Sequence, residues 1–227
     1  MNKKSKSINK KRKIKNKTIR KNKKNYNKAR GTIYYMDKDK VEHTKLTYNG
    51  LPFFRKVYIN PPHNEEQKYL KKVEITIVKI LMEHPNQNIV TYYDINNRYV
   101  DMEELNTDKS NSLFFDEPMM TSREIIEIQE IMKNVKDFLQ ELGIMYVDWK
   151  FDNIGKSRID GKYKLFDFDA SGLINLSTKE WKLKPMEKYW SYKEAIKNGA
   201  RTPKEIDEWS FRYNIIEEGN KMIHKNI

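Results

Sequence analysis

Four polar side chains in the second half of the chain have the types and spacing that phosphoryl transfer requires. Asp148, Lys150 and Asn153 stand close together, and Asp167 follows a short apolar stretch in the sequence Asp167-Phe168-Asp169. Two carboxylates, one amine and one carboxamide at these spacings suit a base, a phosphate contact and two metal ligands. An ordered set arises by chance far less often than a single acidic residue. The sequence therefore predicts a site that handles a nucleotide.

A hairpin is expected to bring two of these groups together. Asp160-Gly161 is a strong two-residue turn signal between the strand-like segments 154–159 and 162–166. Pairing across this turn places Asn153 close to Asp167 at the open end of the ribbon. An amide oxygen and a carboxylate at one place suit a hard cation that also binds nucleotide phosphates.

The hydrophobic patterns predict a small sheet followed by helices. Strands are expected at 32–35, 43–48, 53–58, 89–93 and 98–102, the second and third joined by a turn at Asn49-Gly50. Asn64 and Gln67 have the capping-box form and begin a helix that continues to about residue 83. A second capping box at 121–124 opens a long amphipathic helix that ends at Gly143.

The composition suits a soluble chain with room for one core or two small lobes. It has 227 residues, of which 37% are hydrophobic and 34% charged. No apolar run approaches the roughly 20 residues that span a bilayer, so neither a transmembrane segment nor a secretory signal is expected. The absence of Cys excludes a disulfide framework and a thiolate metal site, which fits a reducing compartment.

The charge is concentrated at the N-terminus. Residues 1–30 hold 15 of the 45 basic side chains and none of the 32 acidic ones, so residues 31–227 carry 30 basic against 32 acidic groups. A self-repelling segment with so little apolar surface is expected to be a disordered basic tail. Two interpretations stay open: a solubilising tail, or contact with nucleic acid, an anionic surface or an import receptor.

The chain is therefore expected to have three parts. The basic tail covers 1–30, a first lobe covers 31–102, and a second lobe covers 103–227. The polar, turn-rich residues 103–120 are interpreted as the connection between the lobes.

The ordered residues resemble two motifs of eukaryotic-type protein kinases. Asp148-x-Lys150-x-x-Asn153 is similar to the kinase catalytic loop, and Asp167-Phe168 is similar to the metal-binding motif. Downstream, the segment 207–211 resembles the start of the kinase helix F, so the likeness covers roughly residues 32–220. It implies an α+β, bilobal protein-kinase-like fold with a small antiparallel-sheet N-lobe and a truncated, mainly helical C-lobe.

The resemblance implies a role for each catalytic-loop residue. Asp148 would orient the substrate hydroxyl and accept its proton, and Lys150 would meet the transferring phosphate. Asn153 and Asp167 would hold Mg²⁺ against the phosphates of ATP. The implied activity is that of a serine/threonine protein kinase acting on a protein substrate.

A lysine and a glutamate in the first lobe complete the implied nucleotide site. Lys56 would contact the α- and β-phosphates, and an ion pair with Glu74 would align it. Arg55 is an alternative to Lys56, and Glu65 or Glu66 are alternatives to Glu74. Further along the chain, the resemblance gives Glu194 and Asp207 structural roles that anchor the activation segment and the catalytic loop.

The sequence departs from the kinase pattern at four places. No glycine-rich loop occurs near 36–41, and Tyr146-Val147 replaces the usual His-Arg, which makes control by activation-loop phosphorylation unexpected. Asp169 replaces the glycine of Asp-Phe-Gly, and the chain ends soon after the helix F segment. None of these changes removes the base or a metal ligand.

Three alternatives to an active protein kinase stay open. One is a catalytically weak or inactive pseudokinase that serves as a binding scaffold, because positioning is what a degraded site loses first. Another is a phosphotransferase for small molecules, since Asp-Phe-Asp occurs in more distant kinase-like enzymes. The third is nucleic-acid binding through residues 1–30.

The Lys-, Asn- and Ile-rich composition resembles that of kinase-like proteins of large DNA viruses. An intracellular location is expected. For a viral protein this would be the host cytoplasm, a viral factory or the virion, and the nucleus is a further possibility for a chain with a basic tail.

Overall fold

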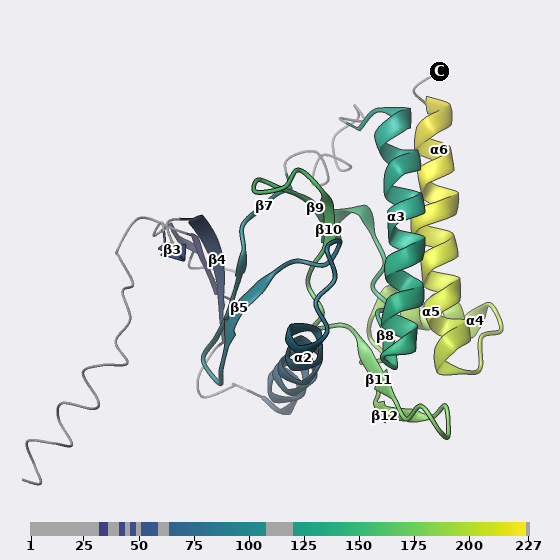
Figure 1. Ribbon diagram of the computed structural model, residues 1–227. Helices are drawn as coiled ribbons and strands as arrows, with labels where there is room; N and C mark the ends of the chain where they lie inside the picture. Colours follow the sequence, from purple (N-terminus) through teal and green to yellow (C-terminus); the bar gives the residue numbers. More distant parts are fainter. Residues whose placement is uncertain are drawn as a thin grey trace, which may run out of the picture.

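The computed structural model describes residues 32–35, 41–43, 46–48, 51–58, 64–107 and 120–225 of the chain. Figure 1 shows two bodies side by side, a sheet with one helix beside it and a group of helices that contains the C-terminus. The predicted tail at 1–30 and the expected glycine-loop region at 36–40 lie outside the described residues.

The first body is a six-stranded sheet. Its strands are β1 (Thr32–Tyr35), β2 (Val41–His43), β3 (Leu46–Tyr48), β4 (Leu51–Val57), β5 (Tyr92–Ile95) and β6 (Tyr99–Glu103). The order is β2-β1-β4-β6-β5, with β3 also paired to β4. Every pairing is antiparallel except that between β1 and β4.

Several expectations for this sheet are confirmed, with different boundaries. Tyr48 lies opposite Leu51, as the predicted hairpin at Asn49-Gly50 requires. The segment predicted as one strand at 43–48 instead contributes to two strands, β2 and β3. The strand predicted from residue 89 begins at Tyr92, because Ile89 pairs with Leu165 of the other body.

Helix α2 (Glu65–Glu83) packs beside this sheet, next to β5 (Figure 1). It begins where predicted, since the side chain of Asn64 accepts a hydrogen bond from the backbone N–H of Gln67. The predicted apolar face is buried, and Glu74 is buried on the same face. The helix thus points one carboxylate into the protein.

The second body is built on α3 (Ser122–Glu141). Both hydrogen bonds of the predicted capping box form between Thr121 and Glu124, and Gly143 follows the helix with φ of +76°. The other helices are α4 (Trp190–Lys197), α5 (Pro203–Phe211), a π-helical segment (Arg212–Glu217) and α6 (Glu218–Lys225). Figure 1 shows α6 running alongside α3.

Short strands carry the chain between these helices. One small sheet has the order β10-β9-β7, and the other has the order β12-β11-β8. The strands are β7 (Leu105–Asn106), β8 (Ile144–Met145), β9 (Ile154–Ser157), β10 (Tyr163–Leu165), β11 (Gly172–Ile174) and β12 (Trp181–Leu183). Strand β7 follows β6 of the large sheet in the chain and pairs with β9 of the second body, so this pairing joins the two bodies.

The predicted hairpin at Asp160-Gly161 forms with a wider turn than expected. The backbone N–H of Ser157 donates to the carbonyl of Lys162, so the turn holds residues 158–161 rather than two residues. The hydroxyl of Ser157 accepts hydrogen bonds from the backbone N–H groups of Ile159 and Asp160, which satisfies the extra turn residues.

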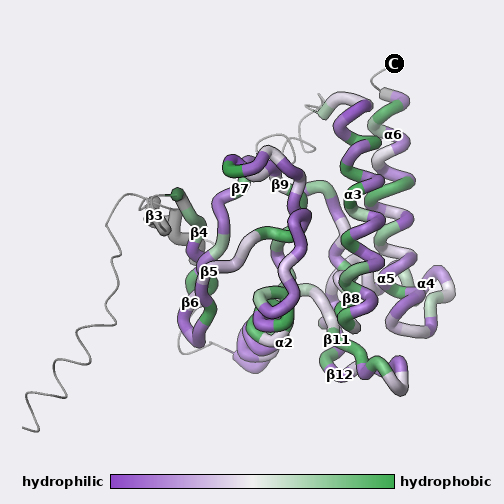
Figure 2. Tube along the Cα trace, in the orientation of Figure 1, coloured by the Kyte–Doolittle hydropathy of each residue, from purple (hydrophilic) through white to green (hydrophobic). Residues whose placement is uncertain are grey.

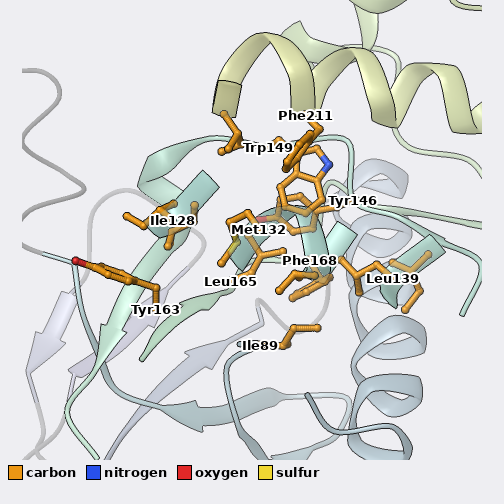
Figure 3. Close-up of a cluster of buried hydrophobic side chains, with 14 of the residues drawn as sticks. Ile89, Ile128, Met132, Leu139, Tyr146, Trp149, Tyr163, Leu165, Phe168 and Phe211 are labelled. Atoms are coloured by element: carbon orange, nitrogen blue, oxygen red, sulfur yellow. The ribbon is translucent and has the colours of Figure 1, made fainter. Parts of the chain in front are cut away.

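One hydrophobic core joins the two bodies. Figure 3 shows side chains from α3, the loop after β8 and α5 meeting around Phe168. Val73 and Ile77 of α2 belong to the same cluster. Figure 2 shows hydrophilic and hydrophobic residues alternating along α3 and α6, as expected of amphipathic helices. Among the described residues, no helix has the length and apolar character needed to cross a membrane.

Thr121→Ala is expected to lower the free energy of unfolding by about 1 kcal/mol, because it removes the hydrogen bond that the Thr121 hydroxyl accepts from the backbone N–H of Glu124. Chemical denaturation followed by circular dichroism measures this change. Thr76→Ala is the matched control, since the Thr76 hydroxyl donates to a carbonyl within α2 and caps nothing. Equal losses in both variants would contradict the capping role.

Candidate active site

The catalytic-loop residues predicted from the sequence lie together. The loop after β8 contains a single 3₁₀ turn, Phe151–Asn153. The ammonium group of Lys150 lies 2.8 Å from a carboxylate oxygen of Asp148. The Asn153 amide donates to the backbone carbonyl of Asp148 at 3.0 Å and to its carboxylate at 3.2 Å. The loop therefore fixes the Asp148 carboxylate through two neighbours.

Asp207 of α5 holds this loop from behind. Its Oδ1 accepts from the backbone N–H of Val147 at 3.0 Å and from the indole N–H of Trp149 at 2.8 Å. Its Oδ2 accepts from the Gln140 amide at 3.0 Å. Val147 has φ of +62°, which a β-branched residue adopts only under constraint. The buried carboxylate satisfies the backbone of this strained position.

Asp167 is brought to the loop by β10. The backbone N–H of Phe166 donates to the carbonyl of Asn153 at 3.0 Å, and the Tyr146 hydroxyl donates to the carbonyl of Phe166 at 2.5 Å. The Phe168 ring packs 5.0 Å from the ring of Tyr146, measured between centroids. Asp167 has φ of +62°, and its carboxylate lies 2.9 Å from the ammonium group of Lys56.

Lys56 of β4 is the centre of the charge network. Its ammonium group lies 3.0 Å from Glu74, 2.9 Å from Asp167 and 3.2 Å from Asp169. The predicted pair of Lys56 and Glu74 is present, whereas the alternative Arg55 pairs with Asp101 at 2.5 Å. The three carboxylates come from α2 and from the segment after β10.

Burial and charge shift the pKa values of this cluster. For Lys56, burial lowers the pKa, but the charges of Asp167, Asp169 and Glu74 outweigh it and hold the pKa well above its usual value. For Asp167, burial raises the pKa, but the charge of Lys56 brings it below its usual value. Burial raises the pKa of Asp169, and it raises the pKa of Glu74 to about 7.

Two partners in this network are not obvious from the sequence. Tyr58 donates its hydroxyl to the second oxygen of Glu74 at 2.9 Å. Asp169 binds Lys56, and its place in the Asp-Phe-Asp sequence is the signal that identifies it. Trp149 lies outside this network and was also not predicted, because nothing in the sequence shows that its indole N–H donates to Asp207.

The donor set fits a hard cation that also binds a nucleotide. The carboxylates of Asp148, Asp167 and Asp169 lie against Lys150 and Lys56, and the Asn153 amide nitrogen is bonded to Asp148. Mg²⁺ is typically held by one or two carboxylates plus substrate phosphates. Within the described residues, no group of three or more His, Cys, Asp or Glu side chains forms a metal site by itself. A bound Mg²⁺ would take its other ligands from water or from a nucleotide phosphate.

The segment after β12 is attached to α2. The Tyr69 hydroxyl donates to the backbone carbonyl of Lys184 at 2.8 Å, and Lys188 forms an ion pair with Glu66. The anchoring role expected of Glu194 has no counterpart in the described contacts, because its carboxylate pairs with Lys197 of the same helix at 3.3 Å. Tyr69 and Lys184 provide a link that the sequence did not predict.

This arrangement defines the class of fold: a bilobal, protein-kinase-like α+β fold. The comparison structure is the kinase PK-1 of Cydia pomonella granulovirus, with a TM-score of 0.57 and 12% sequence identity. The match covers 94% of this chain and 74% of that chain. At this identity the likeness concerns the fold. No known protein-family profile and no curated protein sequence matches the chain.

Trp149→Phe is expected to lower the free energy of unfolding by about 1–3 kcal/mol, because it removes a buried hydrogen bond to Asp207. Thermal and chemical denaturation measure the loss. Trp190→Phe is the matched control, since Trp190 is 52% exposed and has no hydrogen bond among the described residues. An unchanged stability of Trp149→Phe would show that the indole does not support the loop.

The raised pKa of Glu74 predicts a pH-dependent contribution to stability. The folded value of about 7 exceeds the ordinary value, so the proton binds the folded state more tightly. This contribution is complete below the ordinary pKa and is lost as pH rises through about 7. Glu74→Gln should flatten that part of the pH profile, and carboxyl NMR should show Glu74 titrating near 7. A midpoint at the ordinary value would contradict the effect of burial.

Proposed function

We propose that the chain is a minimal protein kinase that transfers phosphate from ATP to a Ser or Thr hydroxyl of a protein. The observation that carries this proposal is the meeting of Asp148, Lys150 and Asn153 with the cluster of Lys56, Glu74 and Asp167. These groups come from both lobes and lie around one region. The kinase-like fold supports the same conclusion.

In the proposed reaction the catalytic loop positions the acceptor. Asp148 orients the hydroxyl and receives its proton, and the Asn153 amide keeps its carboxylate in place. Lys150 is 43% exposed, so its ammonium group is free to move from Asp148 to the transferring phosphate. Electrostatic stabilisation of this kind accounts for most of phosphoryl-transfer catalysis.

The Lys56 cluster positions the nucleotide. Lys56 binds the α- and β-phosphates while Glu74, itself held by Tyr58, keeps the ammonium group in place. Asn153 and Asp167 would hold Mg²⁺, which would neutralise charge on the phosphates. The charge of Lys56 holds the pKa of Asp167 below its usual value, so this carboxylate is ionised before a metal would take the place of Lys56 beside it.

The same cluster supports a second candidate function. Lys56 engages both Asp167 and Asp169, and an ammonium group that stays there blocks a metal ligand. A protein in this state is a scaffold with a kinase-like fold and no transfer activity. A phosphotransferase for small molecules is the third candidate, supported by the Asp-Phe-Asp sequence.

We further propose a two-lobed organisation for the chain and a viral setting for the protein. Residues 31–102 and 103–227 are assigned to the two lobes, with 1–30 as a basic tail for nucleic acid, an anionic surface or an import receptor. The granulovirus neighbour supports a viral setting. In that setting the protein would act inside an infected cell or in the virion.

A transfer assay with radiolabelled ATP and Mg²⁺ tests the function on protein acceptors and on the chain itself. Asp148→Asn is expected to reduce transfer by at least about 100-fold while Mg²⁺-ATP binding persists. Asp167→Ala should lose both. Asp137→Asn, on the exposed side of α3, is the matched control and should retain activity.

The outcomes separate the three candidates. Label on phosphoserine or phosphothreonine supports the protein kinase, and label only on small acceptors supports the small-molecule enzyme. Nucleotide binding without transfer to any acceptor supports the scaffold. Full activity of Asp148→Asn would reject the catalytic role of that residue.

A further inference from the structure

A groove lies between α3, α5 and the π-helical segment, and none of the catalytic residues lines it. Its volume is about 780 Å³, within the range of ligand-binding clefts. Trp209, Phe211 and Ile216 contribute its apolar part, and Lys133, Lys204 and Arg212 contribute cationic groups. The groove therefore combines an apolar lining with positive charge.

The acidic residues of the groove are already engaged within the protein. Glu208 binds Lys136 through both oxygens at 2.6 Å. Glu205 accepts from the backbone N–H groups of Arg201 and Thr202 at 2.7 and 2.9 Å, which lowers its pKa. Glu208 therefore offsets Lys136, and Glu205 stays ionised, so the charged side chains that line the groove carry four positive charges against two negative ones.

The cations, in contrast, are available. Lys133 and Lys204 have no ion-pair partner among the described residues, and both are exposed. Arg212 is 65% exposed and has one ion pair, to Glu217 at 3.4 Å. The groove thus has a surplus of positive charge, although residues 31–227 as a whole carry more acidic than basic groups. An anionic partner complements this surface.

An aromatic ridge continues the groove at the surface. It consists of Trp190, Trp209 and Tyr213, with the rings of Trp209 and Tyr213 stacked at 5.1 Å and an angle of 7°. Trp190 lies 6.0 Å from Trp209 between ring centroids and is 52% exposed. Trp209 and Tyr213 are partly buried, so Trp190 is the exposed member of the ridge. Trp, Tyr and Arg are the residues that most often dominate binding energy in protein interfaces.

We propose that this groove and ridge bind an acidic segment of a partner protein. Carboxylates of the segment would pair with Lys133, Lys204 and Arg212, and an apolar side chain would cover Trp209 and Ile216. A protein segment fits better than single-stranded nucleic acid, because one face of Trp209 is already stacked on Tyr213 and is unavailable to a base. This binding does not depend on phosphoryl transfer.

Fluorescence anisotropy of a labelled peptide of alternating Glu and Leu, added to the full chain, tests the proposal. The double variant Lys133→Glu/Lys204→Glu should bind the peptide at least about tenfold more weakly, since two attractive contacts become repulsive. The matched control is Lys72→Glu/Lys79→Glu on the exposed side of α2, which changes the net charge equally. This control should retain binding, because its groove is intact. Both variants keep the basic residues 1–30, so any attraction of that segment for the peptide is the same in the two.

Two further arms test the apolar part and the class of partner. Trp190→Ser, and replacement of Leu by Ser in the peptide, should each weaken binding severalfold. The affinity for oligothymidylate should be the same in the Lys133/Lys204 variant as in the Lys72/Lys79 control variant. Near-UV circular dichroism verifies folding, and Lys133→Met/Lys204→Met, which adds no repulsion, should show a smaller loss than the Glu variant.

Three results would overturn the proposal. If the groove variant and the α2 variant lost peptide affinity equally, net charge rather than the groove would account for binding. Oligothymidylate that competes more tightly than the peptide, with the same dependence on Lys133 and Lys204, would make this a nucleic-acid groove. No peptide binding by the folded wild-type chain would leave the groove without this function.

Discussion

The ammonium group of Lys56 is the interaction on which the rest of the site depends. It lies in the buried space between the two bodies and balances Glu74, Asp167 and Asp169. A buried charge that loses its partners typically costs 3–5 kcal/mol, so this lysine determines both where α2 sits and where Asp167 points. Because three carboxylates share one cation, burial leaves the pKa of Glu74 raised, and that group becomes the pH-sensitive member of the set.

A second constraint fixes the catalytic loop from the opposite side. Asp207 satisfies the backbone of the strained Val147 and the indole of Trp149, and the Trp149 ring packs edge-on against Phe211 at 5.1 Å between centroids. The loop is therefore held by α5, while Asp167 and Asp169 are held by Lys56 of the sheet. Catalysis by positioning requires both supports, since little covalent chemistry is involved.

Local signals predicted the two capped helices and the closeness of Asp148, Lys150 and Asn153, because caps and short motifs depend on residues that are near one another in the sequence. The caps at Asn64 and Thr121 and the hairpin partner of Asn153 are examples. Long-range features were not predictable in this way. The parallel pairing of β1 with β4, the attachment of Asp169 to Lys56 and the width of the Ser157 turn each depend on residues that only the folded chain brings together.

The proposed function requires the Asp167 carboxylate to be released by Lys56, since an ammonium group that stays on it would block a metal ligand. A crystal structure with Mg²⁺ and a non-hydrolysable ATP analogue tests it directly. The account predicts Mg²⁺ bound by Asn153 and Asp167, with Lys56 on the phosphates and still paired with Glu74. Nucleotide bound without metal, with Lys56 still on Asp167, would contradict it.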